Sequence, residues 1–217
     1  MGRRGKLADR GSRHDDAYKR AKDQGFASRA VFKLEEIDKR FKLLQPGRRV
    51  IDLGCWPGSW MQYAAGRVGP EGFVLGLDLA KVELDLPPFA QAFEADVFEV
   101  EPADITAKFG DFNVLLSDMA PKTTGDKATD MFRSEELTRR ALTIATTVLR
   151  PGGHFCAKVF TGGGFKQLLA DVRALFSECK PVHPKDTRSG SYEQYIVARG
   201  LKAGARTTGT PTTSSEI

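Results

Sequence analysis

The stretch from Val50 to Trp60 constrains the fold of this chain more than any other. It starts with an apolar run around Asp52, which is typical of a buried strand, and continues with a glycine-containing turn. The residues from Ser59 onward then predict the start of a helix. A strand, a tight loop and a helix in this order indicate an α/β protein, in which ligands bind at the carboxyl ends of the strands.

Two glycines in this loop, Gly54 and Gly58, would let the backbone approach a ligand where a Cβ would collide. Their G-x-x-x-G spacing is neither the G-x-G-x-x-G of a pyrophosphate-binding loop nor the ending of a P-loop. The loop therefore favours a nucleoside-like cofactor without a phosphate at this point. An ordinary glycine-rich turn between a strand and a helix explains the same pattern equally well.

The chain has 217 residues, enough for one sizeable core. We expect a basic, partly flexible segment over 1–24, a single domain over 25–202 and a disordered tail over 203–217. No apolar run reaches membrane-spanning length and no export signal precedes the domain, so a cytoplasmic monomer is expected. The three cysteines have no metal-binding spacing, which predicts no metal and reduced thiols.

The formal net charge of +5 favours polyanionic partners without identifying one. The basic residues are concentrated at the start of the chain, where such a run is more often a solvated surface than a binding arm. They are Arg3, Arg4, Lys6, Arg10, Arg13, Lys19, Arg20 and Lys22.

Apolar residues recur at three- and four-residue spacing after Ser28 and predict an amphipathic helix that ends before Pro46. Lys33 lies on this helix beside the apolar stripe. From the helix alone, a surface lysine with its stem on the apolar stripe is the better interpretation.

Four apolar segments, 49–53, 73–77, 92–95 and 112–117, predict strands, and each contains or precedes an acid. Asp78 follows the second strand about 20 residues after the glycine loop, the position that accepts hydrogen bonds from ribose hydroxyls. Asp96 follows the third strand, where it would accept from an adenine amino group or cap the next turn. Asp118 follows the fourth.

The second half of the chain predicts a mobile loop over 122–130, helices over 134–149 and 165–176, and strands over 154–160 and 191–198. Lys158 interrupts the apolar strand 154–160. A buried ammonium group costs several kcal/mol unless it is paired, so Lys158 predicts a functional role. Glu193 stands near the start of the last strand.

The motifs D-L-G-C-W-P-G-S-W, L-G-L-D, E-A-D, L-L-S-D-M-A-P, C-A-K-V-F and Y-E-Q-Y-I-V-A occur in this order between residues 52 and 198. With them, the chain resembles the FtsJ/RrmJ family of S-adenosylmethionine-dependent RNA ribose 2′-O-methyltransferases from about residue 13 to residue 202. The resemblance implies a Rossmann-like methyltransferase fold. Its sheet would have seven strands, mostly parallel with one antiparallel strand, and helices on both faces. It also implies ribosomal RNA or the assembled large subunit as the partner, with methylation of a uridine of 23S RNA.

By the same resemblance, a catalytic tetrad is expected at Lys33, Asp118, Lys158 and Glu193. Positions that contact S-adenosylmethionine are expected at Gly58, Trp60, Asp78, Asp96 and Asp118, and Asp52 and Gly54 of the glycine loop complete the expected cofactor-binding set. Cys55-Trp56 departs from the small residues that the family more often has there, which would tilt the adenosine pocket.

The chemistry of methyl transfer to a ribose hydroxyl needs in-line positioning and a base for the hydroxyl proton. A lysine becomes a base near neutral pH when desolvation or a second cation lowers its pKa, and Lys33 beside Lys158 would have that effect. Carboxylates nearby raise the pKa of a lysine, so the net direction of the shift does not follow from the sequence. Two structural ion pairs are the alternative explanation of the four charged residues.

Other functional classes remain open at this point. A nicotinamide-dependent oxidoreductase lacks the expected G-x-G-x-x-G, and an amine methyltransferase lacks an Asn/Asp-Pro-Pro-aromatic motif. A pyrimidine C5 methyltransferase would need a cysteine nucleophile, for which Cys156 is the only candidate. An RNA-binding domain without activity would not need all four charged residues of the tetrad.

Four further cations, on loops at the same edge of the sheet, are expected to hold RNA: Lys122, Lys127, Lys185 and Arg188.

Overall fold

A single seven-stranded sheet organises the chain in a computed structural model that describes residues 16–185 and 192–210. The strand order is β3-β2-β1-β4-β5-β7-β6, and only β7 runs antiparallel to its neighbours. This confirms the expected Rossmann-like fold. The strands are β1 (Arg49–Leu53), β2 (Phe73–Asp78), β3 (Ala90–Glu94), β4 (Phe112–Ser117), β5 (Leu149–Phe160), β6 (Phe176–Val182) and β7 (Glu193–Leu201).

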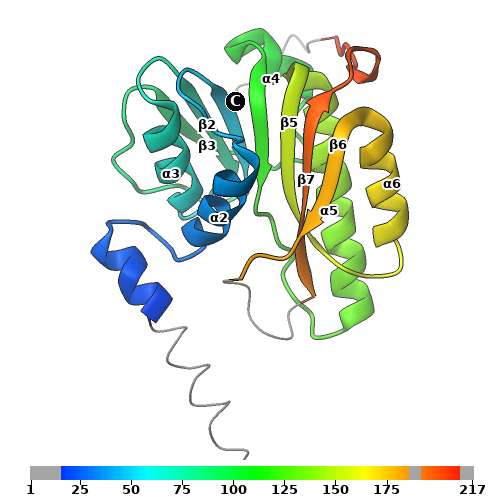
Figure 1. The fold of residues 1–217 in the computed structure, drawn as a ribbon, viewed down its shortest axis with the longest axis horizontal. Helices are drawn as coiled ribbons and strands as arrows, with labels where there is room; N and C mark the ends of the chain where they lie inside the picture. Colours follow the sequence, from blue (N-terminus) through cyan, green and yellow to red (C-terminus); the bar gives the residue numbers. More distant parts are fainter. Residues whose placement is uncertain (1–15, 186–191, 211–217) are drawn as a thin grey trace, which may run out of the picture.

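Helices cover both faces of the sheet (Figure 1). Successive residues of a strand point to opposite faces, so Val50 packs in the core beneath α2 and α3 while Ile51 packs in the core beneath α4, α5 and α6. The helices are α2 (Val31–Phe41), α3 (Ser59–Val68), α4 (Pro102–Phe109), α5 (Lys127–Val148) and α6 (Phe165–Leu175), preceded by a helix over 16–23.

The carboxyl ends of β1 and β4 form the point where the chain winds in opposite directions along the sheet. β1 pairs with β2 on one side and with β4 on the other, all parallel. The loops after these two strands therefore diverge and leave a crevice between them, where open α/β sheets bind ligands. The antiparallel register then brings the start of β7 to the same edge, because Phe160 at the end of β5 pairs with Glu193.

Three elements were not predicted from the sequence: the helix over 16–23, α4 and β6. The first and α4 are short. The interior of β6, residues 177–181, is mostly polar and exposed and does not alternate between buried and exposed positions, so it gives no strand periodicity. The predicted loop over 122–130 is too long, because α5 begins at Lys127 and not at residue 134. Asp126 caps this helix by accepting a hydrogen bond from the Thr129 N–H at 2.8 Å.

The described chain continues beyond the expected domain boundary at residue 202. Residues 203–205 form a short 3-10 helix, and the Thr207 N–H donates to the Thr146 carbonyl at 2.9 Å. Arg206 forms an ion pair with Asp111. Residues up to Gly209 therefore contact the domain, whereas 211–217 lie outside the described residues, as do 1–15 of the basic segment.

Candidate functional site

A cavity of about 360 Å³ opens at the carboxyl edge of the sheet, between the ends of β1, β2, β3 and β4. Four residues expected to bind the cofactor line it: Gly54, Asp78, Asp96 and Asp118. Trp56 also lines the cavity and is 59% exposed, so the aromatic residue that departs from the family pattern stands at its rim.

Gly54 is required by the close approach of two loops. Its φ is +74°, and a Cβ built on it would lie 2.6 Å from Cγ of Met119, which follows β4. Gly58 also has a positive φ, +107°, but a Cβ there would meet Leu84 at 2.4 Å. Gly58 does not line the cavity, so packing against a neighbouring loop accounts for this glycine in the structure.

The two acids after β2 and β3 already accept hydrogen bonds from the backbone. Asp78 accepts from the N–H groups of Trp56 and Ala80, at 2.8 and 2.9 Å. Asp96 accepts from the N–H of Phe98 at 2.9 Å, which is the turn cap considered from the sequence. Each carboxylate has further lone pairs for a ligand. The ribose and adenine contacts remain predictions.

Asp52 lies within β1, completely buried, and neither carboxylate oxygen has a hydrogen-bond partner among the described residues. Burial raises the pKa of this carboxyl well above its usual range, and the charges of Asp118 and Asp78 add to the effect. Buried polar groups are nearly always paired. Asp52 itself does not line the cavity but precedes the lining residue Gly54 by two positions, so its unpaired carboxyl lies near the cavity wall.

Trp60 is placed differently from the four expected cofactor residues that line the cavity. It is buried on the α2 side, donates from Nε1 to the Ala30 carbonyl at 2.9 Å and packs against the ring of Tyr195 at a centroid distance of 5.8 Å. It does not line the cavity. In the structure Trp60 supports α2 and the ring of Tyr195.

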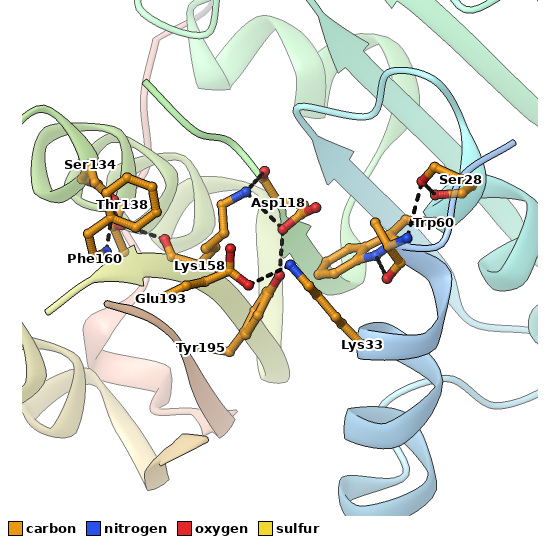
Figure 2. Close-up of polar contacts among 12 residues, drawn as sticks. Ser28, Lys33, Trp60, Asp118, Ser134, Thr138, Lys158, Phe160, Glu193 and Tyr195 are labelled. Atoms are coloured by element: carbon orange, nitrogen blue, oxygen red, sulfur yellow. Dashed lines mark hydrogen bonds and ion pairs between the residues drawn. The ribbon is translucent and has the colours of Figure 1, made fainter. Parts of the chain in front are cut away.

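The four residues of the expected tetrad meet beside the cavity as two ion pairs (Figure 2). Lys158 Nζ lies 3.0 Å from Oδ1 of Asp118 and donates to the carbonyl of the same residue at 2.5 Å. Lys33 Nζ donates to Oε1 of Glu193 at 2.5 Å. The side chains come from α2, the end of β4, β5 and the start of β7, and are between 7% and 18% exposed.

Tyr195 links the two pairs and was missed in the sequence. Its hydroxyl donates to Oδ1 of Asp118 at 2.6 Å, and Lys33 Nζ lies 5.9 Å from the centre of its ring. The ring is fully buried, and burial together with the Asp118 and Glu193 charges raises the pKa of this phenol. Strand alternation could have indicated Tyr195 from the sequence, because it lies two residues after Glu193 and therefore on the same face of the strand.

Helix α5 supports the strand that carries Lys158. Thr138 donates from its hydroxyl to the Lys158 carbonyl at 2.8 Å, and Ser134 accepts from the Phe160 N–H at 2.9 Å (Figure 2). Both side chains are buried. The strand end therefore bonds to α5 at Lys158 and at Phe160, a role that the sequence analysis did not assign to these two residues.

Cys156 is not placed to act as a nucleophile. It is completely buried in the core beneath α2 and α3, and burial raises the pKa of its thiol, with the Asp118 and Asp52 charges adding to the effect. A thiolate is therefore disfavoured at this position. This removes the only candidate nucleophile for C5 methylation of a pyrimidine.

The structure describes three of the four loop cations that are expected to hold RNA. Lys122 is exposed, Lys127 donates to the Tyr192 hydroxyl at 2.8 Å, and the Lys185 N–H donates to Glu36. Arg188 lies outside the described residues. In the basic N-terminal segment, the Arg20 guanidinium lies 3.6 Å from the centre of the Phe32 ring.

The described ranges hold no group of three or more His, Cys, Asp or Glu side chains that could bind a metal ion. Among the helices in those ranges, none is both long and apolar enough to cross a membrane.

Comparison with solved structures supports the fold. A crystal structure of a ribosomal RNA methyltransferase from Plasmodium falciparum superposes with a TM-score of 0.70 at 23% identity, over 81% of this chain and 98% of the other.

Sequence comparison identifies the family. The model of the FtsJ-like methyltransferase family matches residues 26–201. The curated Ribosomal RNA large subunit methyltransferase E of Desulfatibacillum aliphaticivorans is 46% identical, over 86% of this chain and 90% of that protein. The protein of the same name from Desulfosudis oleivorans is 42% identical, over 89% and 94%. The chain therefore belongs to the FtsJ-like methyltransferase family.

Proposed function

We propose that this protein is a cytoplasmic ribosomal RNA methyltransferase that uses S-adenosylmethionine to methylate a ribose 2′-hydroxyl, on a uridine of the large-subunit RNA. The observation that carries the proposal is the meeting of two lysine–carboxylate pairs beside a cavity lined by strand-end acids, in a member of the FtsJ-like family. The names of the curated relatives support ribosomal RNA as the substrate.

The cavity suits S-adenosylmethionine in size and in the chemistry of its wall. Its volume is in the range of small-molecule sites, and its wall combines the apolar rim of Trp56 with the carboxylates of Asp78 and Asp96. Asp78 would hold the ribose hydroxyls, and the buried Asp52, two residues before the lining residue Gly54, would exchange a hydrogen bond with the cofactor. When bound, the cofactor supplies a methyl group activated by its sulfonium.

The valence of the Lys158 nitrogen fits the role of a base. As a neutral amine, Lys158 would direct its two N–H groups to the carbonyl and to Oδ1 of Asp118, the two contacts present in the structure. Its lone pair would then accept the proton of the 2′-hydroxyl. The hydroxyl oxygen would form the new bond to the methyl carbon while the bond from that carbon to the sulfonium sulfur breaks and its electron pair stays on the sulfur, which leaves as a neutral thioether. Asp118 would stabilise the ammonium produced on Lys158.

Lys33 and Glu193 would position the acceptor ribose. Their ion pair lies at the start of β7, across Tyr195 from the first pair, where Lys33 is 17% exposed and within reach of an incoming RNA. A cation there attracts the phosphate or the 2′-oxygen of the substrate, and Glu193 fixes the direction of the ammonium group.

The proposal is tested by incubating the purified protein with S-adenosylmethionine carrying a labelled methyl group and with large ribosomal subunits or free RNA from cells that lack the enzyme. Digestion to nucleosides should yield 2′-O-methyluridine as the labelled product. Label on a base, or on no nucleoside at all, would contradict the proposed reaction.

A further inference from the structure

A second cavity, of about 180 Å³, opens near the two ion pairs and has no part in the reaction described above. Its wall comes from three parts of the chain: the loop before α5, the first turns of α5, and the adjoining ends of β5 and β7. The residues are Thr123, Lys127, Asp130, Met131, Phe160 and Tyr192.

The position of this cavity relates it to the acceptor ribose. Phe160 follows Lys158 by two residues on β5, which corresponds to roughly 7 Å along a strand. Tyr192 directly precedes Glu193, and Glu193 pairs in register with Phe160. The cavity therefore adjoins the tetrad. A nucleotide whose ribose lies at the tetrad could place its own base, or that of the next nucleotide, in this cavity.

Tyr192 presents an aromatic ring that is held in place. The side chain is 45% exposed, while its hydroxyl accepts from Lys127 Nζ at 2.8 Å and the same nitrogen lies 5.0 Å from the ring centre. Its carbonyl accepts from both the N–H and the hydroxyl of Thr161, at 2.7 and 3.0 Å. A ring fixed at both ends loses little conformational freedom when a flat ligand stacks on it.

The remaining wall suits a flat, uncharged ligand better than a phosphate. Met131 and Phe160 are apolar, and Gly162 leaves room for Met131, since a Cβ at that glycine would lie 2.9 Å from the Met131 Cβ. Lys127 and Asp130 bring one charge of each sign. The charges of the lining residues thus sum to zero, whereas phosphate sites carry an excess of cations.

We propose that this cavity binds an unpaired base of the RNA at the methylation site, stacked on Tyr192, and so contributes to the choice of nucleotide. The inference rests on the proposed function for its RNA substrate. Unpaired bases are recognised in proteins by stacking on aromatic side chains and by hydrogen bonds to their edges, and Tyr192 offers the ring while Lys127 and Asp130 offer polar groups.

Photo-crosslinking tests the contact directly. A transcript of large-subunit ribosomal RNA containing 5-iodouridine would be bound by the full-length protein, irradiated, digested and mapped by mass spectrometry. We expect crosslinked peptides at Tyr192 or Met131. Crosslinks that omit both residues while the RNA is demonstrably bound would overturn the proposal.

Kinetics with matched variants provide the second readout. Tyr192→Leu should raise KM for the RNA roughly 5- to 100-fold, while Tyr192→Phe keeps the ring and should recover most of that loss. Phe132→Leu is the control, because Phe132 is an exposed aromatic on α5, 63% exposed, that does not line the cavity. An unchanged KM for Tyr192→Leu would also overturn the proposal.

The tests of the base-binding cavity can be distinguished from the test of the proposed methylation reaction. The methylated nucleoside made by the unsubstituted protein reports on the reaction alone, whichever residues the RNA crosslinks. If 2′-O-methyluridine forms but Tyr192 neither crosslinks nor affects KM, the base-binding cavity fails and the reaction stands. If a base is methylated instead and Tyr192 crosslinks, the reaction fails and the cavity stands.

Discussion

Tyr195 donates its hydroxyl hydrogen to Oδ1 of Asp118 at 2.6 Å, the same oxygen that lies 3.0 Å from Lys158 Nζ. One carboxylate oxygen therefore receives a phenol and an ammonium group together. Since the ring of Tyr195 is fully buried, this hydrogen bond fixes the carboxylate from the core side. Lys158 contacts the same oxygen, and Asp118 itself lines the cavity.

Removal of that hydrogen bond should lower activity while the domain stays folded. Tyr195→Phe keeps the buried ring and its packing on Trp60 but loses a hydrogen bond to a charged group, worth about 1.5–3 kcal/mol. We expect kcat to fall by about 10- to 100-fold with little change in the KM for S-adenosylmethionine. Steady-state kinetics and a thermal melt measure both effects, and wild-type kcat in the variant would contradict this role.

Substitution of Lys158 discriminates a base from a positioning charge. Lys158→Ala should bind cofactor and RNA yet lose about 10²–10⁴-fold in rate, because a group that accepts the proton is missing. Lys158→Arg keeps the positive charge but is effectively never deprotonated, so it should fail as severely. Single-turnover methylation rates provide the measurement. Recovery with arginine would reassign Lys158 to electrostatic positioning and leave the proton to water or to Asp118.

Substitution of Asp78 tests the site expected for the ribose. Because Asp78 also accepts from the Trp56 and Ala80 N–H groups, Asp78→Asn is a better variant than Asp78→Ala, since its amide oxygen can keep one of these bonds. Loss of a charge-assisted hydrogen bond should weaken binding of S-adenosylmethionine by roughly 1.5–3 kcal/mol. Calorimetry measures this affinity. An unchanged Kd would locate the ribose elsewhere.

Asp52 should make the stability of the protein depend on pH. Burial raises the pKa of its carboxyl in the folded state, so the folded protein holds a proton that the unfolded chain has released. Stability from this group is thus greatest at pH below the ordinary aspartate pKa and decreases as pH rises from there toward the raised value. Asp52→Asn removes this dependence. Melting temperatures of the unsubstituted protein and the variant should be measured between pH 4 and 8. The two should diverge as pH rises, with the variant the more stable. If the two melting temperatures change with pH in parallel, Asp52 does not titrate in this way.

The basic start of the chain should contribute to RNA binding. Deletion of residues 1–15 removes Arg3, Arg4, Lys6, Arg10 and Arg13 but leaves the helix over 16–23, whose Ala21 is buried against the domain. We expect weaker RNA binding and a shallower dependence of affinity on salt, since fewer phosphates are neutralised. Binding of S-adenosylmethionine serves as the control and should not change. A salt slope equal to that of the full chain would mean that this run is only a solvated surface.

Local sequence patterns predict much of the architecture. Apolar runs buried on both faces predict parallel strands, and acids that follow them must gather at one edge, because the carboxyl ends of parallel strands lie together. This rule alone places Asp78, Asp96 and Asp118 at the same edge as the Gly54 loop, and the family resemblance gave their expected roles. Weak local signals explain the missed elements: α4 has eight residues, and the interior of β6 is mostly exposed without the alternation that predicts a strand.

What only the tertiary structure decided is how distant side chains combine. The insertion of antiparallel β7 between β5 and β6 brings Glu193 to Lys33 and Tyr195 to Asp118, contacts that depend on strand register and on the packing of α2. The same packing places Gly58 and Trp60 away from the cavity and leaves Asp52 buried without a partner. Sequence alone determined which chemical groups stand at the ends of the strands, because chain direction and side-chain alternation are local properties. Which of those groups face one another is a property of strand order and register, which contacts between distant parts of the chain determine.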